Sequence, residues 1–385
     1  MNRYLVERLQ PFGTTIFAEM SALAVETGAI NLGQGFPDSD GPDLVKQAAV
    51  DAIRAGHNQY PPGIGVPELR TAIRAHQQRF YGLDYDAGAE ILVTAGATEA
   101  IAAALLALCS PGDEVVTFEP YYDSYAACIA MAGATRRVVT LRAPDYSFEP
   151  DELRAAITPR TRLVLLNSPH NPTGKVFTRA ELALVADLAR EHDLLVVTDE
   201  VYEHLVYDGE HVPMATLPGM RDRTVTIGSG GKTFAFTGWK VGWACASPEL
   251  VIAVKTAKQF LTYVSSGPFQ YAIAVGLQLP DSYFVQFRDE MLEKRNRLCA
   301  GLTDAGFDVL RPQGTYFATV DIRSHGETDG LAFCRSLPRR CGVVAVPSVV
   351  FYDDVEAGAP LVRFACCKRT EVLDEACTRL KSLAK

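Results

Sequence analysis

The sequence contains no apolar run long enough to span a membrane, and its charged N-terminal residues, Met1 to Arg8, do not resemble a signal peptide. It also lacks a surplus of basic residues, because 37 lysines and arginines stand against 46 aspartates and glutamates, for a formal net charge of -9. Nucleic acids and acidic membrane surfaces bind clustered lysine and arginine, so neither is expected as a partner. We predict a soluble, cytoplasmic protein, in which a local basic pocket could still bind a small anion.

Paired cysteine motifs are missing as well. The nine cysteines are scattered and odd in number, with no Cys-X-X-Cys pair and no histidine cluster nearby. This spacing supports neither a disulfide framework nor a metal site, and it is typical of free thiols in a reducing cytosol. We interpret the adjacent Cys366 and Cys367 as packing residues on a strand.

Two nucleotide-binding motifs are incomplete. Residues 231–233, Gly-Lys-Thr, resemble the end of a phosphate-binding P-loop, but that motif requires glycine at position 226, which is threonine. The glycine pairs at positions 33 and 35 and at positions 63 and 65 lack the third glycine of a dinucleotide site. Neither nucleotide-binding fold is therefore expected.

What is present is ordinary globular composition, 48% hydrophobic and 22% charged, in a chain long enough for two domains. From about Glu90, short β-branched runs alternate with helical patterns, which indicates an α/β fold with a mostly parallel sheet flanked by helices. Helices are predicted over residues 98–108 and 179–191. The seven predicted strands span residues 91–94, 114–118, 137–141, 163–166, 194–198, 224–227 and 241–244.

The pattern changes after residue 280 to a long charged helix, short strands and a final helix. We therefore predict a large domain over residues 41–280 and a smaller α+β domain formed by residues 281–385 with residues 1–40. The segment before about residue 40 looks loop-like, because glycines and a proline follow closely over residues 33–37. We expect it to drape over the domain boundary.

The strongest chemical signal is a pair of lysines, Lys232 and Lys240, on one short glycine-containing segment downstream of Asp199 and Tyr202. A lysine amine can form a Schiff base with an aldehyde, and a second cation can neutralise a phosphate. Asp199 ends an apolar run, and a carboxylate facing a pyridine nitrogen keeps that nitrogen protonated, because an opposite charge favours the charged form. The ring would then accept electrons. The order of these residues predicts a covalently bound aldehyde cofactor.

These residues resemble those of the fold-type I, class I and II pyridoxal phosphate-dependent aminotransferases, and the resemblance runs from residues 31–37 to residues 361–364. It implies that pyridoxal 5′-phosphate is the cofactor and that Lys232 binds it covalently. It also implies that Asp199 contacts the pyridine nitrogen and Tyr202 the phenolic oxygen of the ring. These three residues are the predicted catalytic residues.

The resemblance further implies that Ser229 and Lys240 bind the cofactor phosphate. Gly96, Ala97 and Thr98 follow a predicted strand and open a helix, so the amides of Ala97 and Thr98 could receive the phosphate at the positive end of the helix dipole. Taken alone, Thr98 is also typical of an ordinary capped helix.

Tyr122 occupies the position that stacks on the cofactor ring in this family, a contact worth about 0.5–1.5 kcal/mol beyond burial. We interpret its neighbours Tyr121 and Tyr125 as core aromatics. Asn171 precedes a proline, and a residue in that position is held extended. The resemblance implies that Asn171 contacts both the ring's phenolic oxygen and the substrate. His170 is an alternative base, less favoured than the lysine.

Arg363 lies in an apolar stretch, where its guanidinium could bind a substrate α-carboxylate through two parallel hydrogen bonds, with the backbone of Gly35 nearby. A structural ion pair is the alternative for Arg363. Tyr60 matches a family position that reaches the phosphate of the neighbouring subunit, which implies a homodimer. A surface turn is the alternative for Tyr60.

The implied activity is transfer of an amino group from an amino acid to a 2-oxo acid, with 2-oxoglutarate expected. Lys240 stands where many class I enzymes have arginine, a form similar to the kynurenine and glutamine transaminase branch. The sequence also resembles N-succinyl-diaminopimelate aminotransferases of lysine biosynthesis and methionine transaminases. A cysteine-S-conjugate β-lyase would share these motifs. A cofactor-sensing transcription regulator would need a DNA-binding module, which the 30 residues before Asn31 are not expected to hold.

Overall fold

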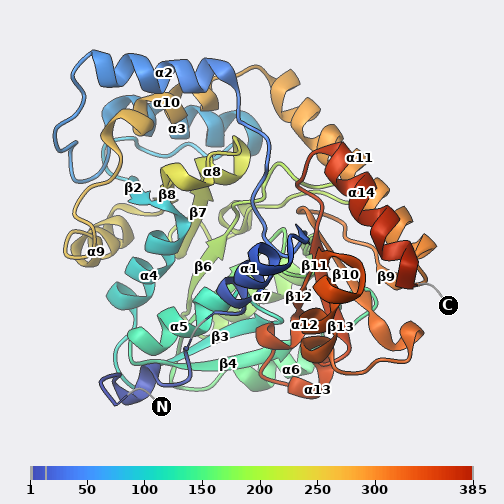
Figure 1. The fold of residues 1–385 in the computed structure, drawn as a ribbon. Coiled ribbons are helices and arrows are strands. Elements are labelled where there is room, and N and C mark those ends of the chain that lie inside the picture. Colours follow the sequence, from blue (N-terminus) through green and yellow to red (C-terminus); the bar gives the residue numbers. More distant parts are fainter. Residues whose placement is uncertain (1–2, 14, 384–385) are drawn as a thin grey trace.

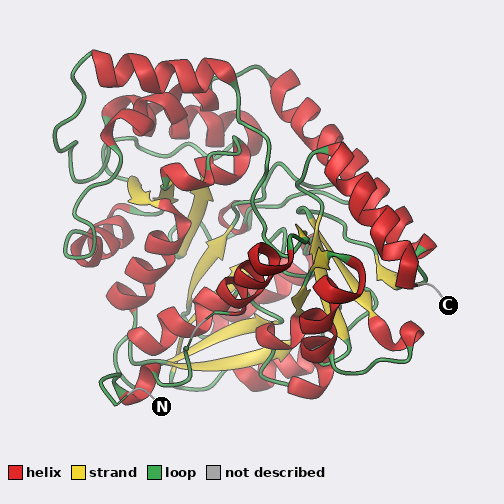
Figure 2. Ribbon diagram, viewed as in Figure 1, coloured by secondary structure: helices red, strands yellow, loops and turns green. Residues whose placement is uncertain are grey.

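A computed structural model describes residues 3–13 and 15–383 and centres on a seven-stranded sheet (Figures 1 and 2). The strand order is β2-β8-β7-β6-β5-β3-β4. Strand β8 runs in the opposite direction to the other six strands of this sheet. All seven predicted strands are present, and the predicted fold class is confirmed. They span β2 (Ile91–Ala95), β3 (Glu114–Glu119), β4 (Thr135–Thr140), β5 (Thr161–Asn167), β6 (Leu195–Asp199), β7 (Thr224–Ser229) and β8 (Val241–Cys245).

Helices cover both faces of this sheet (Figure 1). The predicted helix over residues 179–191 is confirmed with those bounds, since Thr178 and Glu181 form a capping box at its start. The predicted helix over residues 98–108 begins two residues earlier, at Gly96. The helices of this region are α2 (Asp43–Arg54), α3 (Pro67–Tyr81), α4 (Gly96–Leu108), α5 (Asp123–Met131), α6 (Pro150–Ala156), α7 (Arg179–Glu191), α8 (Gly230–Thr233), α9 (Pro248–Lys258) and α10 (Gly267–Leu277).

The central strands are continuous apolar runs because both of their faces are buried. Along β5, Val164 and Leu166 belong to the core that contains α7, whereas Leu163 and Leu165 belong to the core that contains α4. Successive side chains of a strand point to opposite faces, so one run of four apolar residues, Leu163 to Leu166, fills two cores. This arrangement fixes the strand ends, where the site described below lies.

The C-terminal part contains a second sheet, of order β12-β13-β10-β9, and a short parallel pair of β1 with β11. The long helix predicted after residue 280 is α11, which places Phe284 in the core shared with α2 and α3 and Leu298 in the core of the second sheet. The division at residue 280 stays a prediction. The elements are β1 (Ile30–Asn31), α11 (Asp281–Asp304), β9 (Asp308–Leu310), β10 (Phe317–Asp321), α12 (Gly330–Cys341), β11 (Val343–Val344), β12 (Val346–Pro347), α13 (Val355–Gly358), β13 (Leu361–Ala365) and α14 (Thr370–Leu380).

The prediction of a loop-like segment before residue 40 is wrong for residues 16–27, which form helix α1 (Ile16–Thr27). The side chain of Thr15 accepts a hydrogen bond from the amide of Ala18, and Gly28 ends the helix with a φ of 65°. Met20 and Ala24, four residues apart, bury one face in the core of the second sheet. The glycines that suggested a loop, at positions 33 and 35, both follow the helix, so the loop begins only after α1 has ended.

Cys366 and Cys367 are buried in that same core but lie just beyond the end of β13 at Ala365, so their placement on a strand is a small error of boundary. All nine cysteines are free thiols. Within residues 3–13 and 15–383, no helix has both the length and the apolar character that crossing a bilayer requires.

Candidate active site

The candidate site lies where strands of the central sheet end. Asp199 ends β6 and Ser229 ends β7, and the carboxyl ends of parallel strands meet at one edge of a sheet. A cavity of about 290 Å³ opens at this edge. It brings together every predicted site residue except Tyr60, namely Gly35, Gly96, Ala97, Thr98, Tyr122, Asn171, Asp199, Tyr202, Ser229, Lys232, Lys240 and Arg363.

Lys232 presents its amine to this cavity from the short helix α8. Its Nζ lies 3.1 Å from the hydroxyl oxygen of Tyr316 and 3.4 Å from the carbonyl oxygen of Gly35. Burial lowers the pKa of Lys232 to about 8. The unprotonated fraction of the amine near neutral pH is therefore larger than that of an ordinary lysine, and an unprotonated amine is what attack on an aldehyde requires.

Asp199 is a buried carboxylate held by two neighbours. The hydroxyl of Tyr125 donates to its Oδ2 at 2.6 Å, and the amide of Val201 donates to its Oδ1 at 3.4 Å. Burial raises the pKa of Asp199, while the Tyr125 hydrogen bond acts in the opposite direction. Asn167 links this strand end to the next, because its side chain donates to the carbonyl of Asp199 and accepts from the amide of Asn171.

The start of α4 forms a corner of the cavity with free backbone amides and a lysine beside them. Gly96 opens the helix at a φ of 73°, and no side chain caps the helix start. A Cβ on Gly96 would come within 3.3 Å of the Lys240 Nζ, so the ammonium group lies beside the free amides. The alternative in which Thr98 caps the helix is wrong, because the helix begins before it, with the amide of Ala95 donating to Glu99. A lysine at an uncapped helix start is suited to a phosphate.

Arg363, on β13, is fully buried in the same cavity wall. It donates to the Asn171 side-chain oxygen at 2.8 Å and to the Gly33 carbonyl at 3.1 Å, while its Nε has no partner. Among the described residues no carboxylate forms an ion pair with it, so the alternative of a structural ion pair is wrong. Burial lowers the pKa of Arg363 to about 10, and the guanidinium stays charged at neutral pH. A buried cation of this kind favours an anionic ligand.

Two tyrosines complete the predicted ring contacts. Tyr202 is buried, and its ring lies 5.7 Å from the Lys232 Nζ and edge-on to Tyr316 at 5.3 Å. Tyr122 lines the cavity at the start of α5, with its ring edge-on to Tyr125 at 5.7 Å. Both tyrosines line the cavity, and the Tyr202 ring lies beside Lys232.

Several residues of the site were not predicted from the sequence. Tyr316 bonds both Lys232 and the Gly35 carbonyl, and Phe317 lies 4.0 Å from the Arg363 guanidinium. An aromatic pair at the start of a strand is also typical of a core, so no sequence signal distinguishes it. Phe17 and Gln34 line the cavity from the N-terminal segment, and the missed helix α1 would have indicated Phe17. Tyr125 is a core residue, as predicted, but it also contacts Asp199.

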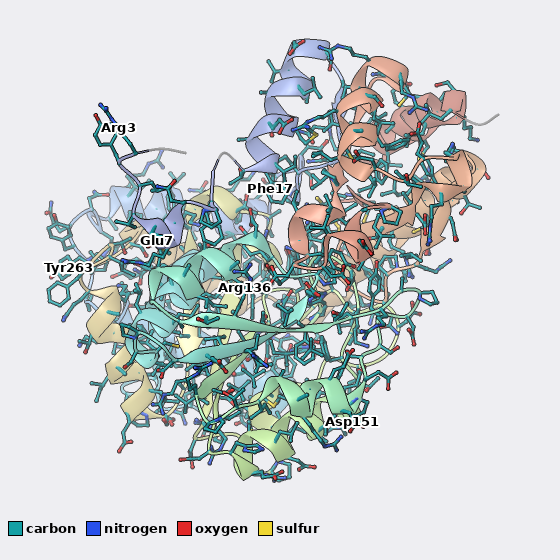
Figure 3. The ribbon with its side chains drawn as sticks, turned by 90° about the horizontal axis from the view of Figure 1, so that it is seen from below. Arg3, Glu7, Phe17, Arg136, Asp151 and Tyr263 are labelled. Carbon is teal, nitrogen blue, oxygen red and sulfur yellow. The ribbon has the colours of Figure 1, made fainter. Side chains whose placement is uncertain are left out.

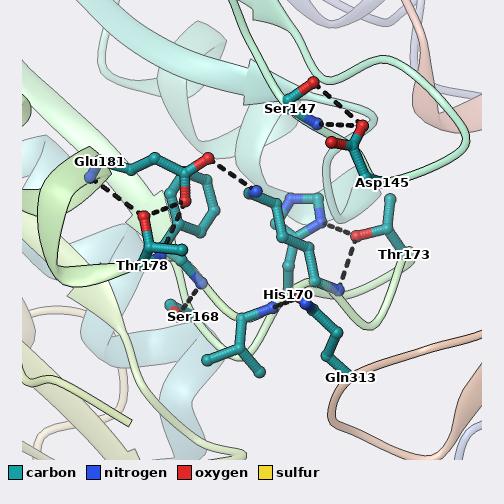
Figure 4. A network of polar contacts seen from close by, with 11 residues as sticks. Asp145, Ser147, Ser168, His170, Thr173, Thr178, Glu181 and Gln313 are labelled. Atoms are coloured by element: carbon teal, nitrogen blue, oxygen red, sulfur yellow. Dashed lines mark hydrogen bonds and ion pairs between the residues drawn. The ribbon is translucent and has the colours of Figure 1, made fainter. Parts of the chain in front are cut away.

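His170, the alternative base, does not line the cavity. Its Nδ1 lies 2.8 Å from the Thr173 hydroxyl, inside a network that includes Ser168 and Gln313 (Figure 4). Burial lowers the pKa of His170 to about 3. The geometry therefore assigns His170 to the packing of this loop and leaves Lys232 as the base that faces the cavity.

Tyr60 lies apart from the cavity of its own chain. Its side chain is 81% exposed, and its ring meets that of Tyr263 edge-on at 5.5 Å. Tyr263 lies at the outer edge of the molecule in Figure 3, well away from Phe17, which marks the cavity. The predicted contact of Tyr60 with a neighbouring subunit stays a prediction.

The residues fit pyridoxal 5′-phosphate. A buried carboxylate, a lysine with a lowered pKa and an uncapped helix start beside a second lysine surround one cavity, which matches a pyridine nitrogen, an aldehyde and a phosphate in turn. When bound, this cofactor supplies an aldehyde that a lysine can bind and a ring that withdraws electrons from a substrate. A cavity with these residues at the strand ends of a mostly parallel α/β sheet defines a pyridoxal phosphate-dependent transaminase.

Comparison with known proteins agrees with this class. Residues 27–380 match the family "Aminotransferase class I and II", and the chain belongs to that family, with its fold type I and its pyridoxal phosphate cofactor. The probable N-succinyldiaminopimelate aminotransferase DapC of Mycobacterium tuberculosis strain H37Rv is 52% identical over 99% of this chain and 98% of its own. The solved N-succinyldiaminopimelate aminotransferase from Mycobacterium tuberculosis has a TM-score of 0.97, covering 99% of this chain and 100% of that one. The methionine aminotransferase of Escherichia coli K12 is 39% identical over 98% of this chain and 97% of its own.

Proposed function

We propose that this aminotransferase acts on N-succinyl-LL-2,6-diaminopimelate, exchanging its amino group with 2-oxoglutarate in lysine biosynthesis. The observation that carries the proposal is the 52% identity with DapC over nearly the whole of both chains, together with a TM-score of 0.97. Such similarity leaves the fold and cavity almost unchanged. The substrate itself is what the proposal adds to the family's activity.

Within this proposal, each residue of the cavity has a role. Lys232 holds the cofactor covalently and, when released by a substrate amine, takes the proton from the substrate Cα. Asp199 keeps the pyridine nitrogen protonated from its buried position, and Tyr202 hydrogen-bonds the phenolic oxygen. Arg363, assisted by Asn171, binds the substrate carboxylate in a water-poor wall of the cavity.

The remaining predicted residues of the cavity hold the cofactor in this proposal. The amides of Ala97 and Thr98, the Ser229 hydroxyl and the Lys240 ammonium group bind the phosphate at the α4 corner. Tyr122 stacks on the cofactor ring. Gly35 brings its backbone close to the substrate, and it must be glycine, because a Cβ there would lie 2.5 Å from the Phe317 ring.

A donor panel tests the proposed substrate. Purified holoenzyme is assayed with 2-oxoglutarate and either N-succinyl-LL-2,6-diaminopimelate, kynurenine, glutamine or methionine, and glutamate is measured. We expect kcat/KM to be at least about 10-fold higher for the succinylated donor, because one charge-assisted hydrogen bond to its extra carboxylate contributes about 1.5–3 kcal/mol. A higher kcat/KM for any other donor would contradict the substrate but leave the transaminase intact.

Methionine or kynurenine is the second candidate donor, and the aromatic wall around Arg363 favours it. Phe17, Phe317 and Phe351 all lie within 5.3 Å of the guanidinium carbon, measured to their ring centroids. Such a wall suits an apolar side chain. The same assay separates a cysteine-S-conjugate β-lyase, because lysis of a conjugate yields pyruvate and ammonia without stoichiometric glutamate.

We also propose a homodimer in which Tyr60 binds the cofactor phosphate of the partner subunit. Tyr60 shares its edge of the molecule with the apolar residues Phe260, 83% exposed, and Tyr263, 52% exposed. Exposed apolar groups that cluster in this way favour an interface. The free cysteines favour a reducing compartment, and we propose the cytoplasm.

A hybrid dimer tests the position of Tyr60. One chain carries Lys232→Ala and the other Tyr60→Phe, and two different tags select the hybrid. We expect the Tyr60→Phe homodimer to bind pyridoxal phosphate about 10-fold more weakly, because it loses one hydrogen bond to a charged group. The single working site of the hybrid should regain wild-type affinity, because its Tyr60 comes from the Lys232→Ala chain. Weak binding in the hybrid would place Tyr60 in its own subunit's site.

A further inference from the structure

A second cluster of titratable groups lies next to the cavity, in the turn that contains Tyr202. Glu203 and His204 extend from this turn, and His76 reaches them from α3. The Nε2 atoms of His76 and His204 are 3.0 Å apart, and the Nε2 of His76 lies 3.6 Å from the Glu203 Oε1. One donor atom from each of the three residues lies within 4.8 Å of the other two.

These separations match those of ligands around one small cation. Two atoms held about 2.0–2.1 Å from a tetrahedral zinc ion are about 3.3 Å apart, between the two shorter distances observed. Two imidazoles and one carboxylate are also a donor set that zinc accepts, leaving a fourth position free. Among the described residues, this is the one group of histidine, cysteine and acidic side chains with such a geometry.

Aromatic rings and a second cavity adjoin this cluster. Phe80 packs against His76 at 4.7 Å and against His204 at 4.8 Å, and Phe284 packs against His204 at 4.5 Å, all between ring centroids. These two rings also line a separate cavity of about 620 Å³, together with Glu203 and His204. The cavity provides an entry path to the cluster.

The Tyr81 hydroxyl hydrogen-bonds Glu203, but the contacts between the two histidines and Glu203 leave one ring nitrogen unsatisfied. The single Nε2 of His76 faces both the Nε2 of His204 and the Glu203 carboxylate, and one proton cannot bond both at once. The Nδ1 of His76 is buried without a partner, so the other ring nitrogen offers no alternative pairing. A cation placed between the three atoms would bond all of them together.

We propose that His76, Glu203 and His204 form a binding site for a divalent transition-metal ion of the zinc type, with its fourth position open to the second cavity. The ion would tie α3 to the turn that carries Tyr202, and so stabilise one wall of the active site without contacting substrate or cofactor. The site is structural, and it is independent of which amino acid the enzyme uses.

Metal binding to the holoenzyme tests this site. After dialysis against a chelator, Zn²⁺ is titrated in competition with a chromophoric chelator, and Co²⁺ is added separately to record its visible spectrum. We expect one tight Zn²⁺ per chain, the strong visible bands of tetrahedral Co²⁺, and a higher thermal unfolding midpoint with Zn²⁺. Absence of a stoichiometric site in the wild-type chain would overturn the proposal.

Two variants assign the ligands. Glu203→Gln keeps the shape of the side chain, and His204→Gln removes an imidazole at the cavity, so each should weaken Zn²⁺ binding at least about 100-fold and abolish the Co²⁺ bands. His192→Gln, which removes a histidine at the end of α7, is the matched control and should bind as the wild type does. Wild-type affinity in Glu203→Gln would overturn the assignment. If a variant does not fold, the Co²⁺ spectrum of the wild-type chain decides the outcome alone.

Discussion

Replacing Lys232 with alanine will lower kcat by about 10⁴-fold or more, and the visible absorbance of the covalently bound cofactor will disappear. Proton transfer by a positioned side chain contributes about 10²–10⁴ in rate, and here the same amine also holds the cofactor. The Lys232 amine contacts Tyr316 and the Gly35 carbonyl, whereas the amine of Lys240, the other lysine of the cavity, lies beside Gly96 at the start of α4. Steady-state transamination and an absorbance spectrum measure both effects.

Lys381→Ala serves as the control for this variant, because Lys381 is an exposed lysine that pairs with Asp304 far from the cavity. It should retain both turnover and absorbance. Thermal unfolding of each variant shows whether the fold is preserved. A folded Lys232→Ala chain with normal absorbance and turnover would contradict the role given to this lysine.

Replacing Asp199 with asparagine will lower kcat by about 10²–10⁴-fold. Removing one partner of a buried charge pair costs about 3–5 kcal/mol, and each 1.36 kcal/mol is a tenfold change in rate. Asparagine keeps the shape and the buried position but cannot hold a pyridine nitrogen in its charged form. The variant should still bind pyridoxal phosphate through Lys232 and the α4 corner, so kcat and cofactor affinity, measured separately, will diverge.

Tyr125→Phe is the matched control, because it removes the hydroxyl that donates to Asp199 at 2.6 Å but leaves the carboxylate. We expect a loss of only about 10-fold, the effect of one hydrogen bond to a charged group. That hydrogen bond lowers the pKa of Asp199, so its removal raises the pKa, and activity should fall at a higher pH on the acid side of the profile. Equal kcat values for Asp199→Asn and the wild type would contradict the role of Asp199.

The parts of the fold that could be predicted are those where one physical demand acts alone. The central strands are largely apolar because the sheet is buried on both faces, as β5 shows with Leu163 to Leu166 in two cores. Helix α1 was missed because its only strong signals are the Thr15 cap and Gly28, whereas the glycines that follow it are more conspicuous. The start of α4 was placed two residues late for a related reason, since Ala95 is not a capping residue and Glu99 bonds its amide from within the helix.

The candidate site divides in the same way. Asp199 and Lys232 could be predicted because Asp199 ends β6 and Lys232 comes shortly after the end of β7, and topology brings strand ends together. Tyr316 could not be, since it reaches the cavity from the second sheet through a contact between parts of the chain far apart in sequence. The histidine pair behind Tyr202 was invisible for the same reason, because His76 and His204 are 128 positions apart.

The two hydrogen bonds of Arg363 have a thermodynamic consequence. Its guanidinium already points into the cavity, gripped by the Asn171 side chain and by the carbonyl of Gly33, so its rotamer is selected during folding. A long flexible cation would otherwise have to become ordered at each encounter, which weakens association by about 0.5–1.5 kcal/mol. If Arg363 binds the substrate carboxylate as proposed, its side chain is already ordered before the substrate arrives. The N-terminal segment would then affect substrate affinity through the Gly33 carbonyl, which holds Arg363.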